Sequence, residues 1–300
     1  MQGLILLDKP KDITSFGAVA KIKRIASEKR VGHTGTLDPM ATGVLPVLLG
    51  RATALSSLLL DADKRYTAKV KLGVTTDTDD ITGDIITETE VGVTDEQIDL
   101  ALKHFTGKIM QKPPMYSAIK KDGVRLYKLA REGKTAEIEA REIEVFSIDL
   151  ISPLNDENIF EIDVHSSKGT YIRSLARDIG EFLGCGACLT ELRRTYTGGF
   201  SFEDCVPLDK LNEENIAEHL MSEETAVAHL RKASVTEKQA VRFCNGGRLD
   251  LDRLKIKDLA DGELVRVKLN DTFLGVGIAD LEKNQLAIKC IINYPKEGSL

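Results

Sequence analysis

The sequence predicts an α+β protein whose N-terminal domain is built on a mixed, mostly antiparallel sheet and whose small C-terminal domain is rich in β-strands. Over most of the chain, segments with the two-residue period of a strand are interspersed with segments of helical period. Toward the C-terminus, short alternating segments separated by glycine and Asn-Asp turns follow one another instead. These two patterns divide the chain into residues 1–232 and residues 233–300.

The N-terminal part is expected to begin with a strand and a helix. The apolar run Gly3–Leu7 predicts a buried strand. Thr14 or Ser15 can cap a helix, because a side-chain hydroxyl there accepts a hydrogen bond from a free backbone N–H, and apolar residues follow at helical spacing. Tyr66–Leu72 alternates apolar and polar residues and predicts a second strand.

Further along, Thr94 and Gln97 form a capping-box pattern that predicts the start of another helix. Phe160–Val164 alternates and predicts a half-buried strand. We expect Thr170 to cap a third helix that Gly184 ends, since glycine readily adopts the left-handed backbone of a helix C-terminus.

The C-terminal domain is expected to contain one short helix and several strands. Thr236–Phe243 has the spacing of a helix. The segments 265–269, 274–278 and 288–292 alternate apolar and polar residues and predict strands. The acidic stretch Glu203–Glu224 is expected to connect the two domains.

The composition is that of an ordinary globular protein. Of the 300 residues, 42% are hydrophobic and 29% are charged. The apolar runs are far shorter than the roughly 20 residues of a membrane-spanning helix, and the N-terminus lacks the pattern of a secretory signal. The 5 cysteines are an odd number, which argues against a disulfide framework. We therefore expect a cytoplasmic protein that does not act at a membrane.

The charge distribution leaves two interpretations open. A formal net charge of −6 argues against a nucleic-acid partner. Basic and acidic residues are nevertheless gathered in alternating blocks, which could form one positive face that attracts a polyanion or could average out on folding. Tyr66, Tyr171 and Tyr196 stand beside basic residues, and this combination favours RNA, whose splayed bases stack on aromatic rings.

The most unusual segment is Gly32–Gly43, which combines several glycines with a histidine, an aspartate and a proline. Such a segment suits a loop of unusual backbone shape that presents His33 and Asp38 from a rigid base. The proline after Asp38 disfavours helical backbone at that residue. An ordinary Asp-Pro turn is the alternative. The segment lacks the Lys-Ser/Thr ending of a phosphate-binding loop.

Arg173 stands where a cation is disfavoured. It falls in the first turn of the helix predicted near Tyr171, close to the positive end of the helix dipole. Residues that break a local rule in this way are more frequent at functional sites. A carboxylate such as that of Asp38 could hold the guanidinium; the alternative is a partly exposed arginine at little cost.

The sequence contains no convincing metal or cofactor motif. Cys185 and Cys188 form a lone Cys-x-x-Cys without the second pair that a zinc site requires, and the histidines are isolated. Asp77–Asp80 does not fit a calcium loop, because Ile81 would occupy its fifth position, so we interpret it as a solvated acidic turn. We predict no metal and no cofactor.

Several short motifs occur together in a defined order. They are residues 8–10, 14–15, 32–43, 63–66, 72–73, 76–78, 83, 113–118, 123–127, 168–173 and 192–195. In this order they resemble the TruB family of bacterial tRNA pseudouridine synthases over nearly the whole chain. One departure is Asp12, where the family usually has glycine, and it concerns the backbone shape of that turn.

The resemblance implies a catalytic domain of the pseudouridine-synthase type followed by a PUA-like RNA-binding domain. It implies that uridine 55 in the T loop of tRNA is flipped out and isomerised to pseudouridine, and that the protein could also assist tRNA folding. The implied partner is the T-arm stem-loop of tRNA. An isomerisation of this kind needs neither metal nor cofactor, because a carboxylate can act as the nucleophile. A monomer is expected, since one chain supplies every motif.

The resemblance assigns the chemistry to three residues. Asp38 would be the catalytic nucleophile. Arg173 would pair with Asp38, lower its pKa and keep it ionised at neutral pH. Tyr66 would stack against the target base and could assist removal of the proton from its C5 atom.

Four further residues are implied in substrate binding. His33 would help displace the target base from the T loop, at an unstacking cost of a few kcal/mol. Tyr171 and Leu192 would line the pocket that receives it. Lys9 would contact phosphate, as would other cations of the basic blocks.

Three other functions stay open. An RNA-binding protein could help tRNA fold without chemistry. A guide-RNA-dependent pseudouridylase shares the central motif, although the short segment before Asp8 and the segment Asp77–Glu90 favour the stand-alone type. A nucleotidyltransferase has the least support, because no second lysine-rich signature loop is present.

Overall fold

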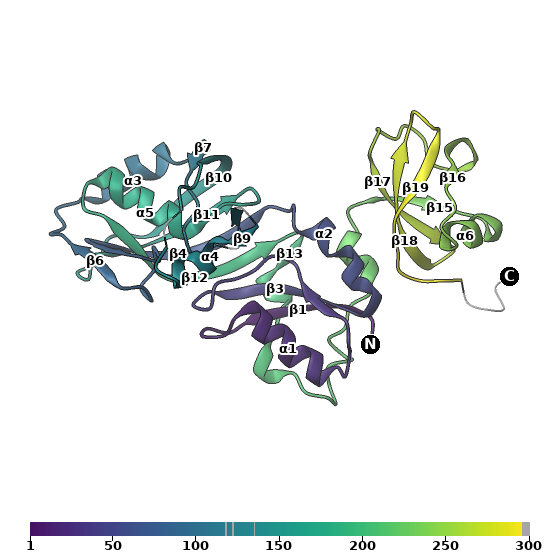
Figure 1. The fold of residues 1–300 in the computed structure, drawn as a ribbon, viewed down its shortest axis with the longest axis horizontal. Helices are drawn as coiled ribbons and strands as arrows, with labels where there is room; N and C mark the ends of the chain where they lie inside the picture. Colours follow the sequence, from purple (N-terminus) through teal and green to yellow (C-terminus); the bar gives the residue numbers. More distant parts are fainter. Residues whose placement is uncertain (118, 122, 135, 296–300) are drawn as a thin grey trace.

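The computed structural model describes residues 1–117, 119–121, 123–134 and 136–295. It confirms the α+β fold, with a large sheet in the N-terminal part and a small β-rich domain at the other end of the molecule (Figure 1). Ala118, which ends the motif that begins at residue 113, lies outside the described residues.

Within the described residues, ten strands form the large sheet in the order β14-β1-β3-β12-β4-β11-β10-β7, with β2 beside β3 and β13 beside β12. Neighbours are antiparallel except in the pairs β1–β14 and β3–β12. The bounds are β1 (Gly3–Lys9), β2 (Val31–His33), β3 (Thr42–Leu49), β4 (Lys64–Leu72), β7 (Gly107–Gln111), β10 (Arg141–Ser152), β11 (Ile159–Ser166), β12 (Ala187–Thr197), β13 (Phe200–Ser201) and β14 (Val206–Pro207).

One face of this sheet is covered by three helices. On β4, Tyr66, Ala68 and Val70 alternate with more exposed residues, as the sequence predicts. They share one apolar core with the buried sides of the helices α1 (Ser15–Ile25), α3 (Asp95–His104) and α5 (Ile172–Leu183). The apolar face of the strands and the apolar faces of the helices thus pack together in a single core.

The smaller elements decorate this framework. They are the helices α2 (Ser56–Leu59) and α4 (Leu126–Arg131), the hairpin strands β5 (Val74–Thr76), β6 (Ile85–Glu88), β8 (Lys120–Lys121) and β9 (Val124–Arg125), and the 3-10 turns η1 (Gly50–Leu55), η2 (Phe202–Asp204), η3 (Leu208–Lys210) and η4 (Glu223–Val227).

The predicted helix starts are confirmed at two places and wrong at a third. Thr14 accepts a hydrogen bond from the backbone N–H of Gly17, and Thr94 forms its capping box. Thr170 does not cap α5: its hydroxyl donates backward to the carbonyl oxygen of Ser167, so the helix begins two residues later without a side-chain cap. Gly184 ends α5 with φ of 79°, as expected.

The C-terminal domain is a five-stranded sheet in the order β15-β17-β18-β19-β16. Its elements are β15 (Arg231–Ser234), α6 (Glu237–Cys244), β16 (Leu249–Asp250), η5 (Leu251–Arg253), β17 (Leu264–Leu269), β18 (Thr272–Asp280) and β19 (Gln285–Ile291). These include the predicted short helix and strands. The domain boundary expected between residues 232 and 233 falls within β15, which already belongs to this sheet. The position of that boundary stays a prediction.

The connection between the domains is packed. From the acidic stretch Glu203–Glu224, β14 adds to the edge of the large sheet beside β1. At its end, Glu224 forms ion pairs with Arg266 at 2.8 Å and with Lys268 at 2.7 Å, both on β17. A second apolar cluster also spans the two parts, from Leu4 on β1 to Phe273 on β18.

No helix among the described residues is long and apolar enough to cross a membrane.

The turn at Asp12 keeps a shape that usually calls for glycine. Asp12 has φ of 63°, in the left-handed region, and its N–H donates to the carbonyl oxygen of Pro39. Aspartate tolerates this conformation better than most residues that carry a side chain. The departure from the family pattern at Asp12 therefore leaves the turn in place, docked on the loop that contains Asp38.

Gly43 is required where β3 meets β12. It has φ of 100°, and a Cβ atom at this position would lie 2.1 Å from the carbonyl oxygen of Arg194. The two strands are parallel at this point, with Gly43 opposite Arg194. The absence of a side chain is what lets the Asp38 loop approach β12.

We expect Gly43→Ala to destabilise the protein by about 2 kcal/mol or more, because the new methyl group would force two strands apart at a strained backbone position. Gly92→Ala is the matched control, since a methyl group added to Gly92 would meet no atom within 4 Å and the backbone there is unstrained. Urea unfolding would measure both. Equal effects of the two substitutions would contradict this account of Gly43.

Candidate active site

Asp38 lies in a loop that is fastened at both ends. The loop leaves β2 at His33 and enters β3 at Thr42. In its middle, the Ser15 hydroxyl at the start of α1 accepts from the N–H of Leu37 at 2.8 Å and donates to its carbonyl oxygen at 3.0 Å. Leu37 itself is buried. The loop therefore presents Asp38 from a rigid base, as the sequence predicts.

Lys9 supports this loop from below. Its side chain is fully buried at 0% exposure, and its Nζ atom donates to the carbonyl oxygens of Pro10, Ile13 and Pro39. Burial lowers the pKa of Lys9 to about 8. This placement speaks against the phosphate contact predicted for Lys9, because no phosphate can reach its ammonium group; it ties the loop to the turn after β1 instead.

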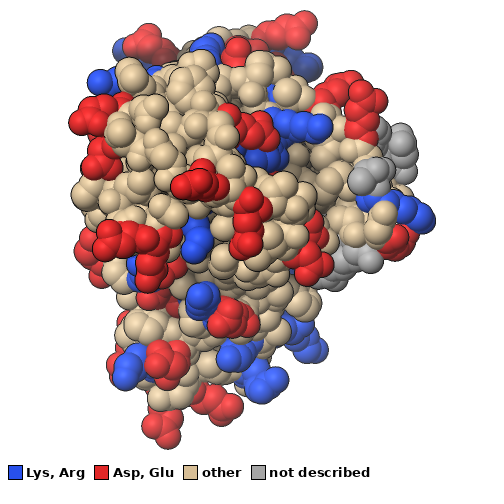
Figure 2. Space-filling view, turned by 90° about the vertical axis from the view of Figure 1, so that its left-hand side faces the viewer, with Lys and Arg blue, Asp and Glu red and all other residues tan. Residues whose placement is uncertain are grey.

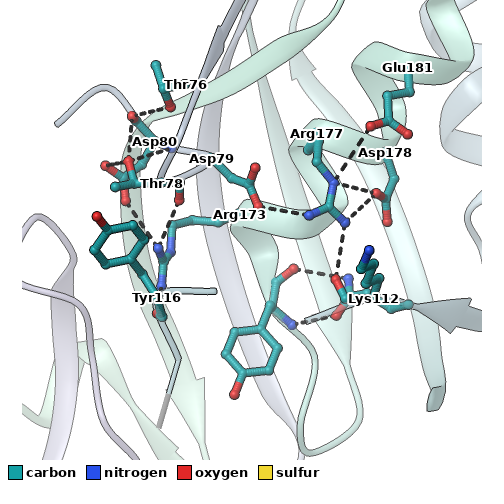
Figure 3. Close-up of polar contacts among 12 residues, drawn as sticks. Thr76, Thr78, Asp79, Asp80, Lys112, Tyr116, Arg173, Arg177, Asp178 and Glu181 are labelled. Carbon is teal, nitrogen blue, oxygen red and sulfur yellow. Dashed lines mark hydrogen bonds and ion pairs between the residues drawn. The ribbon is translucent and has the colours of Figure 1, made fainter. Parts of the chain in front are cut away.

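Arg173 is the centre of the site. Its Nε atom lies 2.8 Å from Oδ2 of Asp38, and its Nη1 atom lies 3.5 Å from Oδ2 of Asp80. Nη1 and Nη2 also donate to the carbonyl oxygens of Thr78 and Tyr116, both at 2.9 Å (Figure 3). The guanidinium is only 5% exposed. Two carboxylates and two carbonyls offset the unfavourable position of this cation in the first turn of α5.

The pKa of Asp38 is not lowered below its ordinary value, as the sequence predicts, but raised above it. Burial raises the pKa of Asp38, with a smaller rise from the charge of Asp80; Arg173 and Lys9 lower it without cancelling the effect of burial. About a third of the side chain (34%) stays exposed. Arg173 thus moderates the pKa of a carboxyl group that its surroundings hold above 3.8.

Tyr66 lies on β4 opposite Arg194 of β12. Arg194 is almost fully buried and donates to the carbonyl oxygens of Val44 and Gly35. Burial raises the pKa of Tyr66, so its hydroxyl stays protonated at neutral pH. This disfavours Tyr66 as the base that removes the C5 proton and leaves stacking as its predicted role.

The other three candidate residues lie on three different elements. His33 ends β2, Tyr171 directly precedes α5, and Leu192 lies on β12 opposite Ala68. Burial lowers the pKa of His33 and favours the neutral imidazole. Within the described residues, the polar contacts join Asp38 to Arg173 but not to these three, whose roles stay predictions.

Asp80 is buried, which the sequence did not predict. It is 4% exposed, and its carboxylate accepts from the hydroxyl groups of Thr78 and Thr82, whereas the sequence suggested a solvated acidic turn. The alternation of threonine with aspartate was the available signal, because hydroxyl groups can satisfy a buried carboxylate.

The described residues contain no group of three or more His, Cys, Asp or Glu side chains that could hold a metal ion. Cys185 and Cys188 are both buried and free, and burial raises the pKa of each thiol. A raised pKa keeps a thiol protonated and unreactive. Nothing in this geometry ties the pair to the site.

Charges of both signs are interspersed on the end of the molecule that carries α3 and β6 (Figure 2). On that face the basic and acidic blocks of the sequence therefore average out, which is the second of the two interpretations left open above.

Two family models match adjacent parts of the chain. Residues 23–172 match the N-terminal domain of TruB family pseudouridylate synthase. Residues 173–233 match the C-terminal domain of tRNA pseudouridylate synthase B.

Relatives match the chain over nearly its full length. The tRNA pseudouridine synthase B of Shewanella pealeana is 42% identical over 299 residues, which cover 95% of this chain and 93% of the relative. That of Clostridium tetani is 44% identical over 278 residues, which cover 92% and 95%.

Among solved structures, an H/ACA RNP bound to a substrate RNA containing 2′-deoxyuridine superposes with a TM-score of 0.74 at 28% identity, covering 98% of this chain and 87% of that chain. The archaeal box H/ACA sRNP Nop10-Cbf5 complex gives a TM-score of 0.74 at 29% identity, covering 99% and 89%. These likenesses confirm the fold class that the sequence predicts.

We expect Asp38→Asn to raise the unfolding temperature at pH 7. The folded state holds the Asp38 proton to a higher pH than the unfolded chain does, so ionisation at neutral pH costs folding free energy, and a neutral amide of the same shape removes that cost. The advantage should shrink as the pH falls toward 3.8, the ordinary value. Thermal unfolding by circular dichroism would measure it. A variant less stable than wild type at pH 7 would show that the ion pair with Arg173 outweighs burial.

Proposed function

Because the chain belongs to the TruB family of pseudouridylate synthases, we propose that it converts uridine 55 in the T loop of tRNA to pseudouridine. The observation that carries this proposal is the ion pair between Arg173 Nε and Asp38 Oδ2, 2.8 Å apart, which leaves the Asp38 side chain 34% exposed on a rigid loop. Full-length relatives named tRNA pseudouridine synthase B, 42% and 44% identical, support the choice of RNA.

The proposed chemistry uses one carboxylate. The glycosidic bond from the sugar to N1 of the uracil breaks, the uracil turns, and a C–C bond from the sugar to C5 replaces it. C5 then loses its proton while N1 takes one up from solvent, so atoms and charge balance. Asp38 is the nucleophile that carries the intermediate between the two steps. Arg173 aims the carboxylate, since its Nε atom lies 2.8 Å from Oδ2 while three other protein oxygens, of Asp80, Thr78 and Tyr116, hold the guanidinium in one orientation.

The proposed substrate element is the T-arm stem-loop. A base in a folded loop must be extruded before Asp38 can reach it, at an unstacking cost of a few kcal/mol. His33, at the end of β2, fills the vacated place, and Tyr66 receives the flipped base together with Tyr171 and Leu192. The small C-terminal sheet serves as a PUA-like RNA-binding domain.

The working unit is proposed to be a cytoplasmic monomer without metal or cofactor. One chain supplies the loop of Asp38, the helix of Arg173 and the strand of Tyr66, so the site is complete within it.

The guide-dependent enzyme is the main alternative, because solved structures titled as H/ACA particles share the fold at 28% and 29% identity. The higher identity to relatives named tRNA pseudouridine synthase B favours activity without a guide RNA.

We expect Asp38→Asn to abolish activity while leaving tRNA affinity within about threefold, because the amide keeps the shape of the carboxyl group but is no nucleophile. The measurement is tritium release from a T-arm stem-loop labelled at uridine C5, without guide RNA or added metal, together with filter binding of the same RNA. Asp209→Asn, on an exposed aspartate in η3, is the matched control and should retain full activity.

Release by wild type but not by Asp38→Asn would support the isomerase and its nucleophile. Release by both would remove Asp38 from the chemistry. No release by wild type, from a stem-loop or from full tRNA, would favour a guide-dependent or a non-catalytic RNA-binding protein.

A further inference from the structure

We propose that Arg177 is a positioning residue for this reaction, because it locks together the two loops whose carbonyl oxygens hold Arg173 against Asp38. This inference rests on the proposed function. Arg177 lies one helical turn after Arg173 on α5, and both side chains extend toward the same two loops (Figure 3).

The two arginines contact neighbouring points of each loop. In the first loop, Arg173 donates to the carbonyl oxygen of Thr78, and Arg177 pairs with the next residue, Asp79, at 2.9 Å. In the second loop, Arg173 donates to the carbonyl oxygen of Tyr116, and Arg177 donates to that of Lys112 at 3.1 Å. Each loop is therefore clamped twice from one helix.

The second loop is stiff between its two contacts. Pro113 and Pro114 follow Lys112 directly, and each proline ring restricts one backbone dihedral. A displacement of Lys112 is consequently passed on to Tyr116, where Arg173 is bound. This stiffness gives the Arg177 contact at Lys112 an influence on Arg173.

The first loop is strained where Arg177 holds it. Asp79 has φ of 62°, in the left-handed region, which aspartate adopts more readily than most residues with a side chain but which favours glycine. Strain of this kind persists only where surrounding contacts enforce it. On one side the Asp79 carbonyl accepts from the N–H of Leu189, and on the other its carboxylate meets Arg177. Without Arg177 the Asp79 carboxylate loses this anchor, and the loop is left to its backbone hydrogen bonds and to the Thr78–Asp80 contact.

Arg177 is itself held in one orientation. Its Nε and Nη2 atoms both donate to Oδ1 of Asp178, at 3.0 Å and 2.7 Å, while Nη1 is directed to Asp79. The planar guanidinium therefore has its direction set by four hydrogen bonds, a geometry that lysine cannot reproduce.

Apolar packing does not replace this clamp. A cavity of about 550 Å³ opens beside Arg177 and is lined by parts of both loops, among them Asp79, Lys112 and Pro113. Because the space between the loops is not filled by side chains, polar contacts set their separation. Arg177 adds to those of Arg173 and to the Tyr116 hydroxyl, which donates to Asp77 at 3.3 Å. Burial raises the pKa of Asp79 to about 6, and the positive charge of Arg177 opposes that rise.

The test compares Arg177→Gln with Glu181→Gln by steady-state tritium release from the T-arm stem-loop. Glu181 is the matched control, since it lies on the same helix and its Oε1 atom is 3.9 Å from Nε of Arg177, whereas no hydrogen bond or ion pair among the described residues joins it to either loop. For Arg177→Gln we expect kcat to fall about 10- to 100-fold, because small misplacements of a reacting group cost rates of this size. KM should stay within about twofold, since the clamp lies beneath the site. Glu181→Gln should match wild type in both constants.

Two further variants separate positioning from a merely structural role. Arg177→Lys keeps the positive charge beside Asp79 but loses the planar guanidinium that reaches several acceptors at once. We therefore expect its kcat to lie between those of Arg177→Gln and wild type. In a double-mutant cycle, Asp79→Asn combined with Arg177→Gln should lose little more than Arg177→Gln alone, since the contact that Asp79→Asn removes is already broken in Arg177→Gln. Rates are normalised to the folded fraction at each temperature.

An unchanged kcat for Arg177→Gln, with or without a lower unfolding temperature, would overturn the proposal. So would a raised KM at unchanged kcat, which would assign Arg177 to RNA binding. A wild-type chain without tritium release would overturn the proposed function, and this inference with it; an active wild type whose Arg177 variants keep their kcat overturns the inference alone.

Discussion

The site depends on one ion pair, between Asp38 on a loop and Arg173 on a helix. Each residue carries a charge that its own position disfavours. Arg173 is a buried cation at the positive end of α5, and Asp38 is a carboxylate whose surroundings favour its neutral form. Each supplies the charge that makes the other tolerable. The loops at Thr78 and Tyr116 add the hydrogen bonds without which a buried pair of this kind would be a net cost.

Several buried residues hold the Asp38 loop in position and so support this ion pair indirectly. Lys9 and Arg194 are fully or almost fully buried cations whose donors are used on backbone carbonyls around the Asp38 loop. Gly43 lets the same loop approach β12 closely. Basic residues that a polyanion-binding protein would be expected to display are thus partly committed to its interior. RNA contacts must come from other cations.

Stability and activity make opposite demands at Asp38. Burial around the carboxylate opposes its charge, yet a nucleophile has to be ionised. The loop keeps its shape despite this unfavourable charge because other hydrogen bonds hold it. They come from Ser15 on α1, which binds Leu37, and from Asp12, which donates to Pro39. Conflicts between local preference and global fold of this kind are expected where a protein performs chemistry.

The sequence by itself determined the α+β class, most strands and helices, and the segment of Asp38, because periodicity, capping and turn chemistry act over a few neighbouring residues. Its joint motifs also identified the family. Only the tertiary structure decided that Lys9 is buried, that Asp80 pairs with Arg173, and that Thr170 turns away from α5. These features depend on contacts between residues far apart along the chain, and on which side chains packing removes from water; neither quantity is encoded in the local pattern.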